Sequence, residues 1–177
     1  HDQALGFIGM HGTVASNFAS EEADLVIAAG IRFHDRYTGL PGKFLPKAKV
    51  IQIDIDPAEM NKNCAVDLPI VGDLKNVLTE LNKELTQLKH DEWLEKVKGW
   101  KKEYPLVYRK VGDDKLIPQE VLSELDNILK GDGIVVTDVG QHQMWTAQYY
   151  RFEKGRTFLS SGGLGTMGYG LGAAIGA

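Results

Sequence analysis

The glycine-rich segment from Gly133 to Ala177 constrains what this chain can fold into more than any other part of the sequence. It opens with an apolar run, Ile134–Val136, that predicts a short buried strand over 133–137. The polar residues Gly140-Gln141-His142 follow and predict a turn at the carboxyl end of that strand. In parallel α/β sheets, ligands bind at that end of the strands.

Glycine occupies six of the eleven positions from 162 to 172. Such a density indicates that a ligand or another segment approaches the backbone closely. A flexible linker is the alternative, but linkers are polar and this stretch contains Leu164, Met167 and Leu171. Residues 168–177 are small and apolar, which predicts a tightly packed helix beneath a ligand.

Composition and charge exclude several classes of function. Hydrophobic residues make up 43% and charged residues 25% of the 177 residues, values typical of a globular protein with one domain or parts of two. The net charge of −4 and the absence of a basic cluster argue against a nucleic-acid partner. No apolar run approaches the ~20 residues that span a bilayer, so we expect no membrane association. The single cysteine, Cys64, excludes an internal disulfide and fits a reducing compartment.

The two ends of the sequence predict that it is an internal piece of a larger protein. It has no initiator methionine, and it stops at Gly176-Ala177 inside an apolar helical pattern without a capping residue. The N-terminal residues lack the basic and apolar regions of a signal peptide. We therefore expect a cytoplasmic protein, or a plastid or mitochondrial one if the source is eukaryotic.

The first part of the chain has the pattern of a parallel α/β domain. Continuous apolar runs predict buried strands at 24–30 and 49–56, and a shorter strand at 64–71. A helix is predicted from Thr13, where free N–H groups would form an anion site. Another is predicted at 74–88, where apolar residues recur at helical spacing as a buried stripe.

Charged residues follow the carboxyl ends of two of these strands. Two arginines, a histidine and an aspartate lie in the segment 31–42, which favours a ligand loop over a plain connection. Asp54 ends the next strand, where an acidic residue commonly binds ribose hydroxyls, and we assign Asp56 to capping the helix that begins at Pro57. No G-x-G-x-x-G fingerprint accompanies them, so an NAD-binding Rossmann unit is poorly supported.

The composition changes after residue 88. Residues 89–110 are charged and aromatic, with apolar side chains at three- or four-residue steps. They predict an amphipathic surface helix laid over a neighbouring domain, with a recognition helix as the alternative. We interpret 111–117 as a linker, which divides the chain into a domain at 1–110 and another at 118–177. The second opens with a helix at 118–129.

Five strings of residues carry a resemblance to a known family: GMHGT (Gly9–Thr13), RFHDRYTG (Arg32–Gly39), VIQIDIDPAEMNKN (Val50–Asn63), DVGQHQMWTAQ (Asp138–Gln148) and SSGGLGTMGYGLGAAIGA (Ser160–Ala177). They resemble the catalytic subunits of acetohydroxyacid (acetolactate) synthases, in the same order along almost the whole chain. The resemblance implies an α/β fold: an incomplete Rossmann-like central domain, associated with FAD, and the first part of a thiamine-diphosphate-binding domain.

The resemblance implies a carboligation that depends on thiamine diphosphate. Pyruvate would be decarboxylated and its two-carbon unit joined to pyruvate or 2-ketobutyrate, giving 2-acetolactate or 2-aceto-2-hydroxybutyrate for branched-chain amino-acid biosynthesis. Mg²⁺ and a non-redox FAD would also be bound, in a homodimer or tetramer with a small regulatory subunit. In such enzymes the cofactor supplies the carbanion chemistry and the protein supplies position and field.

The resemblance also assigns binding positions, each carried over by its match to a motif. Thiamine diphosphate is expected at Val139, Gly140, Gln141 and His142 through its diphosphate, and at Gly165 and Met167 through its aminopyrimidine. FAD is expected at Met10, His11, Gly30, Arg32, Arg36, Asp54, Ile55, Asp73 and Met144. Asp35 and Arg36 match the substrate channel.

Three positions depart from the family pattern. His34 stands where aspartate is usual, Tyr37 where valine is usual, and Gly172 where proline would fix φ at the helix entry. No catalytic residue and no metal ligand is expected here, since the activating glutamate would lie upstream and the Mg²⁺ motif just after Ala177. We therefore expect these residues alone to be inactive.

Several alternatives stay open. Another thiamine-diphosphate enzyme, such as a pyruvate oxidase or a glyoxylate carboligase, is disfavoured by the QHQMW and GGLGTMG strings. A non-catalytic nucleotide-binding module would use only the first half of the chain. An NAD dehydrogenase would need the missing glycine fingerprint.

Overall fold

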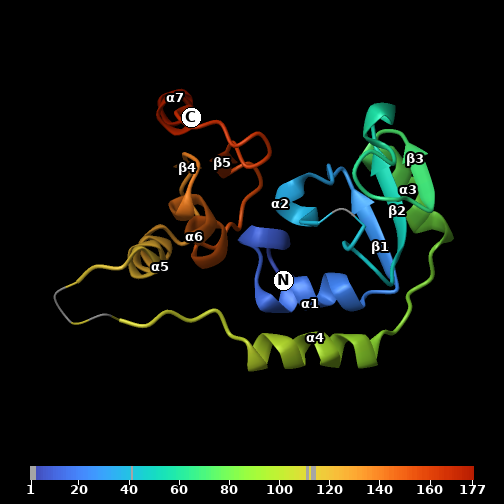
Figure 1. Cartoon of the computed structure of the whole chain (residues 1–177), viewed down its shortest axis with the longest axis horizontal. Coiled ribbons are helices and arrows are strands. Elements are labelled where there is room, and N and C mark those ends of the chain that lie inside the picture. The colour runs from blue at the N-terminus through green and yellow to red at the C-terminus, as the bar shows by residue number, and fades with distance from the viewer. Residues whose placement is uncertain (1–2, 41, 111, 113–114) are drawn as a thin grey trace.

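A computed structural model describes residues 3–40, 42–110, 112 and 115–177 of the chain. Two parallel sheets form within these ranges, one in each half of the chain (Figure 1). Positions 111, 113 and 114 of the predicted linker 111–117 lie outside the described residues. The α/β fold class with parallel sheets is confirmed.

The first sheet consists of β1 (Leu25–Ala29), β2 (Lys49–Asp54) and β3 (Leu68–Val71), in the order β1-β2-β3. All three strands are parallel, so their carboxyl ends lie at one edge. The turns that leave this edge are tied to β2, since Gly30 N donates to Ile53 O at 2.8 Å and Gly72 N donates to Asp54 O at 2.9 Å. The sheet therefore brings its three exit turns together.

The register of the strands decides which face of this sheet is buried. Ala28 lies opposite Gln52, and both are almost fully buried. The core on this face consists of Ala28, Phe33, Leu45 and Val50. On the other face Leu25 and Ile27 remain 50% and 46% exposed, which leaves an apolar surface on β1.

The first half also contains the helices α1 (Val14–Glu22), α3 (Leu74–Glu84) and α4 (Asp91–Glu103), of which α3 packs on β2. The anion site predicted at the start of α1 is partly taken by a capping box, because Ser16 N donates to Thr13 Oγ1 and Thr13 N to Ser16 Oγ. A helix in 89–110 is confirmed, but it lies along α1 of the same half, with the rings of Trp100 and Phe18 5.8 Å apart (Figure 1).

Two predicted elements are shorter than expected. The third strand begins at Leu68 and not at residue 64, because Val66 N donates to the side chain of Asn61 in a local turn. The helix predicted at 74–88 ends at Glu84, and Leu85 and Leu88 are 56% and 66% exposed. Helical spacing alone does not maintain a helix where the apolar residues find nothing to pack on.

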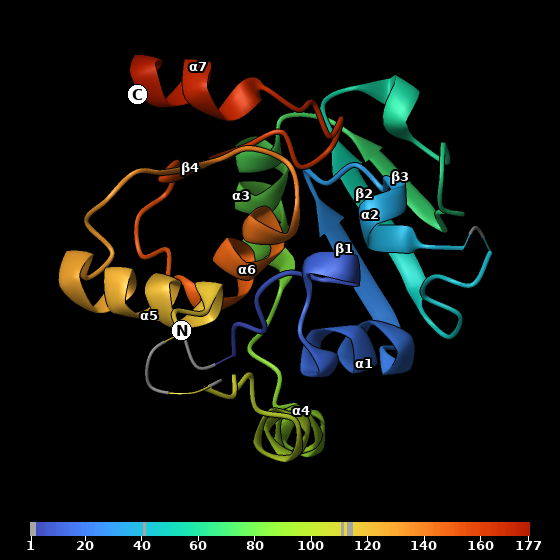
Figure 2. The same cartoon turned by 60° about the vertical axis from the view of Figure 1, so that its left-hand side comes forward.

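The second half contains α5 (Pro118–Leu129), β4 (Val135–Thr137), α6 (Gln141–Tyr149), β5 (Phe158–Ser160) and α7 (Tyr169–Gly176), shown from a second side in Figure 2. β4 and β5 pair in parallel, with Val135 opposite Phe158. The buried carboxylate of Asp126 accepts a bond from Arg151 Nε at 2.5 Å, which ties α5 to the end of α6.

The prediction of a tightly packed helix at 168–177 is wrong in part. α7 forms, and Gly170 is buried against the end of β4. Leu171 and Ile175 are 75% and 80% exposed, because only one side of α7 contacts the sheet. Within the described part of the chain, no helix has the length and apolar character needed to cross a membrane.

Candidate functional site

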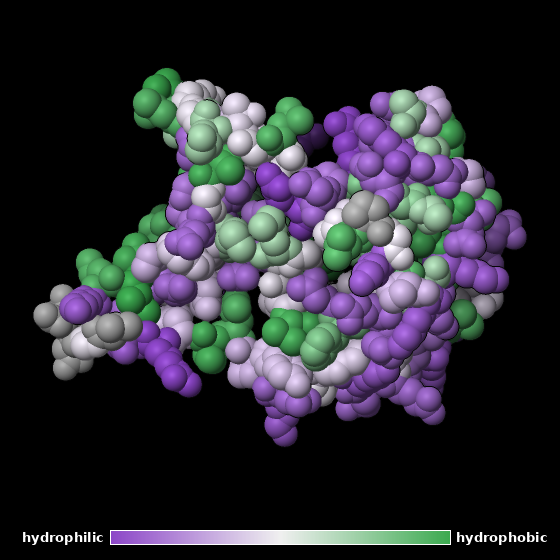
Figure 3. All heavy atoms as spheres, in the orientation of Figure 1, coloured by the Kyte–Doolittle hydropathy of each residue, from purple (hydrophilic) through white to green (hydrophobic). Residues whose placement is uncertain are grey.

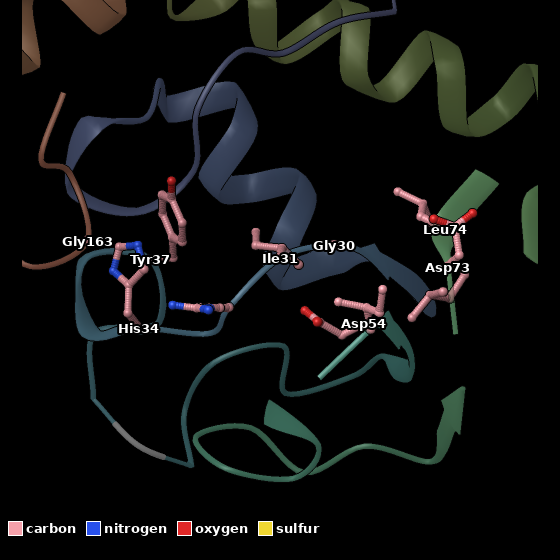
Figure 4. Close-up of a pocket in the computed structure, with 11 residues that line it drawn as sticks. Gly30, Ile31, His34, Tyr37, Asp54, Asp73, Leu74 and Gly163 are labelled. Carbon is pink, nitrogen blue, oxygen red and sulfur yellow. The ribbon is translucent and has the colours of Figure 1, made fainter. Parts of the chain in front are cut away.

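A cavity of about 580 Å³ opens at the carboxyl ends of β1 and β2 (Figure 4). This is the edge at which parallel sheets bind ligands. Five of the residues predicted to contact FAD line it: Gly30, Arg32, Asp54, Ile55 and Asp73. The topology explains why residues more than forty positions apart meet here, since each follows the carboxyl end of a strand of the same sheet.

The polar groups of this first cavity have different local roles. Asp54 Oδ1 accepts from Asp56 N at 3.0 Å, which fixes the carboxylate at the end of β2. Asp73 caps α3 by accepting from the N–H of Asn76 at 3.0 Å. The guanidinium of Arg32 is largely exposed and is only loosely paired, 3.8 Å from Glu59. A carboxylate and an exposed arginine at one edge suit the ribose and phosphates of a dinucleotide.

The capping role predicted for Asp56 is confirmed. Its side chain accepts a hydrogen bond from Ala58 N at 2.9 Å, at the start of the short 3₁₀ helix η2 (Pro57–Glu59).

The segment 31–42 is not a plain loop, because it contains a short helix, α2 (Asp35–Thr38). His34 caps this helix, and its Nδ1 accepts from Arg36 N at 3.3 Å. The rings of His34 and Tyr37 lie 4.2 Å apart at an angle of 35°. Burial lowers the pKa of His34, which favours the neutral ring that the cap requires, with its proton on Nε2.

A second cavity, of about 400 Å³, lies between the two halves of the chain. It shares His34, Tyr37 and Gly163 with the first cavity, so these residues separate two adjoining spaces. The buried His11 lines it from the 3₁₀ helix η1 (Gly9–His11). Gln143 lines it from α6 and donates to Ser160 at the end of β5, 2.5 Å away.

A third cavity, of about 520 Å³, is lined by Met10, Asp35 and Arg36. Arg36 Nη1 lies 2.8 Å from the carboxylate of Asp35 in an exposed ion pair. Arg36 Nη2 lies 3.5 Å from the position that a Cβ on Gly165 would occupy. The fold therefore brings the predicted channel residue Arg36 to the glycine-rich segment. Among the described residues that line these three cavities, Met144 does not occur.

The prediction of a polar turn at 140–142 is wrong in detail. Gly140 is the N-cap of α6, and Gln141 and His142 form the first turn of that helix. Gly140 has φ 153° and ψ −166°, a conformation that side chains disfavour, so glycine lets the helix start directly after β4. The first N–H groups of a helix have no partner within it and favour anions, which suits a diphosphate at this position.

The two predicted thiamine-diphosphate groups lie next to each other. A Cβ on Gly165 would be 4.0 Å from Val139 Cγ1, although the two residues are distant in sequence. Gly165 N donates to Ser161 O at 2.8 Å and has φ +67°. Met167 is 80% exposed and free to contact a bound molecule.

The sequence patterns assigned no role to one residue of this region, Asp138, which is the first residue of the string Asp138–Gln148. Its carboxylate accepts hydrogen bonds from the N–H groups of Val139, Gly168 and Gly170. These bonds hold the pKa of Asp138 below its ordinary value. A carboxylate directly before Val139-Gly140 was the available signal, but two of its three partners lie some thirty residues away.

The described residues contain no group of three or more His, Cys, Asp or Glu side chains that could hold a metal ion.

The structure is that of an α/β protein with cavities at the carboxyl ends of its strands and between its halves, and comparison of the sequence indicates its class. Residues 1–81 match the family model "Thiamine pyrophosphate enzyme, central domain", and residues 138–177 match "Thiamine pyrophosphate enzyme, C-terminal TPP binding domain". Two domain models of the thiamine pyrophosphate enzyme family thus match separate parts of the chain.

Within that family the chain is similar to acetolactate synthases, as the five strings predicted. It is 49% identical over 186 aligned positions to the acetolactate synthase of Mycobacterium bovis, covering 100% of this chain and 30% of the relative. It is 50% identical over 187 positions to the probable acetolactate synthase large subunit of Methanocaldococcus jannaschii, with 100% and 31% covered. It is 44% identical over 183 positions to the acetolactate synthase isozyme 3 large subunit of Escherichia coli, with 99% and 32% covered. The chain thus spans about a third of the length of these relatives.

Proposed function

We propose that the chain is part of the large subunit of an acetolactate synthase, which joins the two-carbon unit of pyruvate to a second 2-keto acid. The observation that carries this proposal is the sequence similarity, close to 50% identity along the whole chain. The geometry supports it, since the segments that match the central and TPP-binding domains meet where Arg36 approaches Gly165.

The residues present suit thiamine diphosphate. The first turn of α6, with Gln141 and His142, would hold the diphosphate, and Gly165 and Met167 would contact the aminopyrimidine. When bound, this cofactor supplies the electron sink for decarboxylation and ligation. The chain's own part is to hold the cofactor between α6 and the segment before α7. The Mg²⁺ ligands would come from residues beyond this chain.

The first cavity suits FAD as a second cofactor. Asp54 would accept hydrogen bonds from ribose hydroxyls, and Arg32 would pair with phosphates. The rings of His34 and Tyr37, which lie against each other at an angle, form part of the wall shared with the second cavity. The flavin would therefore lie close to the boundary of the two halves.

Arg36 has a separate role in the proposed reaction. Its guanidinium lies close to Gly165 and is paired with Asp35 at the surface. It would therefore present a positive charge beside the residues proposed to contact the aminopyrimidine. A carboxylate such as that of pyruvate or 2-ketobutyrate would be attracted to this position.

The surface of the chain supports a place in a larger assembly. Leu164, Leu171 and Ile175 are 93%, 75% and 80% exposed, and hydrophobic residues gather over α7 in the upper left of Figure 3. Exposed apolar patches mark surfaces that other protein covers. A homodimer or tetramer and a small regulatory subunit are the proposed partners, in the cytoplasm or in an organelle.

The function is tested with the full-length subunit and an assay for 2-acetolactate from pyruvate. Omitting thiamine diphosphate or Mg²⁺ is expected to abolish product formation, and omitting FAD to reduce it. Activity that persists without thiamine diphosphate would refute the proposal. Retained flavin without any thiamine-dependent activity would favour a nucleotide-binding module.

A further inference from the structure

Asp138 connects two segments that the proposed function assigns to opposite ends of one cofactor. It lies between β4 and α6, directly before Val139. Its Oδ1 accepts from Val139 N at 2.7 Å, and its two oxygens accept from Gly168 N at 3.0 and 2.9 Å. Oδ2 also accepts from Gly170 N at 3.1 Å. One carboxylate thus binds the backbone on both sides of the proposed site.

The start of α7 depends on this carboxylate. The N-cap of α7 is Gly168, which has φ 89° and no side chain with which to satisfy the first N–H groups. Helices normally obtain that acceptor from a Ser, Thr, Asp or Asn at the N-cap. Asp138 supplies it from another segment, and its negative charge is favoured at a helix N-terminus.

The backbone at the start of α7 also fits tightly against Asp138. A Cβ on Gly170 would lie 2.7 Å from Asp138 N, a distance that real Cβ atoms essentially never show, and 3.1 Å from Asp138 Cα, which is tighter than most real contacts. The preceding residues are fixed at their other end, because Ser161 O accepts from Gly165 N and Ser161 Oγ accepts from Thr166 N. Met167 lies between these two attachments.

We propose that Asp138 is a positioning residue that sets the spacing between the diphosphate-binding and aminopyrimidine-binding ends of the thiamine diphosphate site. Asp138 directly precedes Val139 at the diphosphate-binding end. Asp138 also accepts the hydrogen bond from Gly168 N, and Gly168 directly follows Met167 at the aminopyrimidine-binding end. A displacement of either end is therefore transmitted through one side chain to the other. This role rests on the proposed function and adds a residue that does not itself touch the cofactor.

The experiment compares two variants of the full-length subunit with the wild type. Asp138→Asn keeps the shape of the side chain but replaces one acceptor oxygen with a donor amide, so either Val139 N, which donates to Oδ1, or Gly170 N, which donates to Oδ2, loses its acceptor. Asp132→Asn is the matched control, since Asp132 lies in the same half and pairs at the surface with Lys154. The measurements are the Kd for thiamine diphosphate by equilibrium dialysis with Mg²⁺, the near-ultraviolet circular dichroism of the bound cofactor, the FAD content and the melting temperature.

Asp138→Asn should raise the Kd for thiamine diphosphate about tenfold, because charge-assisted hydrogen bonds are lost. The dichroism of the bound cofactor should change, while FAD content and the melting temperature without thiamine diphosphate stay near wild type. Asp132→Asn should match the wild type in every measurement. Asp138→Glu, which keeps the charge but lengthens the side chain, is the second variant should the asparagine form fail to fold. It is expected to bind the cofactor more weakly than the wild type and with altered dichroism.

Three results would overturn the positioning role. One is wild-type affinity and dichroism in Asp138→Asn, or in Asp138→Glu where that variant is used. Another is a loss of FAD content and melting temperature in proportion to the loss of thiamine diphosphate affinity, which would make the role merely structural. The third is an equal effect of Asp132→Asn. A wild-type subunit that binds no thiamine diphosphate would instead refute the proposed function itself.

Discussion

Replacing Gly170 with alanine tests the packing between α7 and the end of β4 most directly. The added Cβ would lie 2.7 Å from Asp138 N, a backbone atom that cannot rotate away. Either α7 moves outward, or the turn after β4 does. Both movements strain the hydrogen bond from Gly170 N to Asp138 Oδ2. We therefore expect Gly170→Ala to loosen the start of α7.

The magnitude follows from two opposing effects. Overpacking a close contact costs about 1–3 kcal/mol, whereas alanine is favoured over glycine inside a helix by about 1 kcal/mol. Gly172→Ala provides the matched control in the same helix, because a Cβ on Gly172 meets nothing within 4 Å. The control gains the helix preference without the clash. The two variants should differ by about 1–3 kcal/mol in the stability of α7, or about 5- to 150-fold in its opening equilibrium.

Hydrogen exchange of α7 amides in the full-length subunit measures this difference, because exchange reports local opening. Gly170→Ala should exchange faster than the wild type, and Gly172→Ala as slowly or more slowly. Thiamine diphosphate should bind more weakly to Gly170→Ala. Equal protection of α7 in the two variants would show that the contact with Asp138 does not hold the helix.

Two further predictions concern His34 and the chain by itself. Burial outweighs the nearby Asp35 and lowers the pKa of His34 below 6.5, so the loop's contribution to stability is full above that pH and decreases as the pH falls further. Flavin retention by the full-length subunit should therefore weaken as the pH falls through this range. The variant His34→Asn, which caps the helix without titrating, should remove this pH dependence. If His34→Asn shows the same pH profile as the wild type, the role of the cap is contradicted. The 177-residue chain alone should form no 2-acetolactate with thiamine diphosphate, Mg²⁺ and FAD in excess, and turnover in the same assay that serves the full-length subunit would contradict this.

Local sequence signals predicted the strands and several helix starts. Continuous apolar runs correctly located β1, β2 and β4. The burial on both faces that such runs predict does not hold for β1, where Leu25 and Ile27 stay about half exposed. The Asp-Pro pair at 56–57 correctly gave a capped helix start. The assigned cofactor residues stay predictions, although five of the FAD positions share one cavity.

Features that depend on contacts between distant residues were not predictable in the same way. Helical spacing in 74–88 could not show that the packing stops before Leu85. The charges of 31–42 gave no sign of α2, whose cap is a histidine nitrogen. The role of Asp138 depends on N–H groups of a segment that only the fold brings near.

The glycine-rich segment shows where such a signal is ambiguous. Its density predicted close approach to the backbone, and the structure shows such an approach at Gly170, where the approaching group is the backbone of Asp138 and not a ligand. A Cβ on Gly163, Gly168 or Gly172 would meet nothing within 4 Å. Gly165 differs, because its neighbours are Arg36 and Val139, side chains that line the proposed site. The two positions favour glycine for different reasons: a Cβ on Gly170 would clash with Asp138, whereas Gly165 has a φ of +67° that strains other residues. In this chain the glycines therefore reflect close packing of the backbone at one position and a special backbone conformation at the other, and the Gly170 and Asp138 variants test the first of these causes.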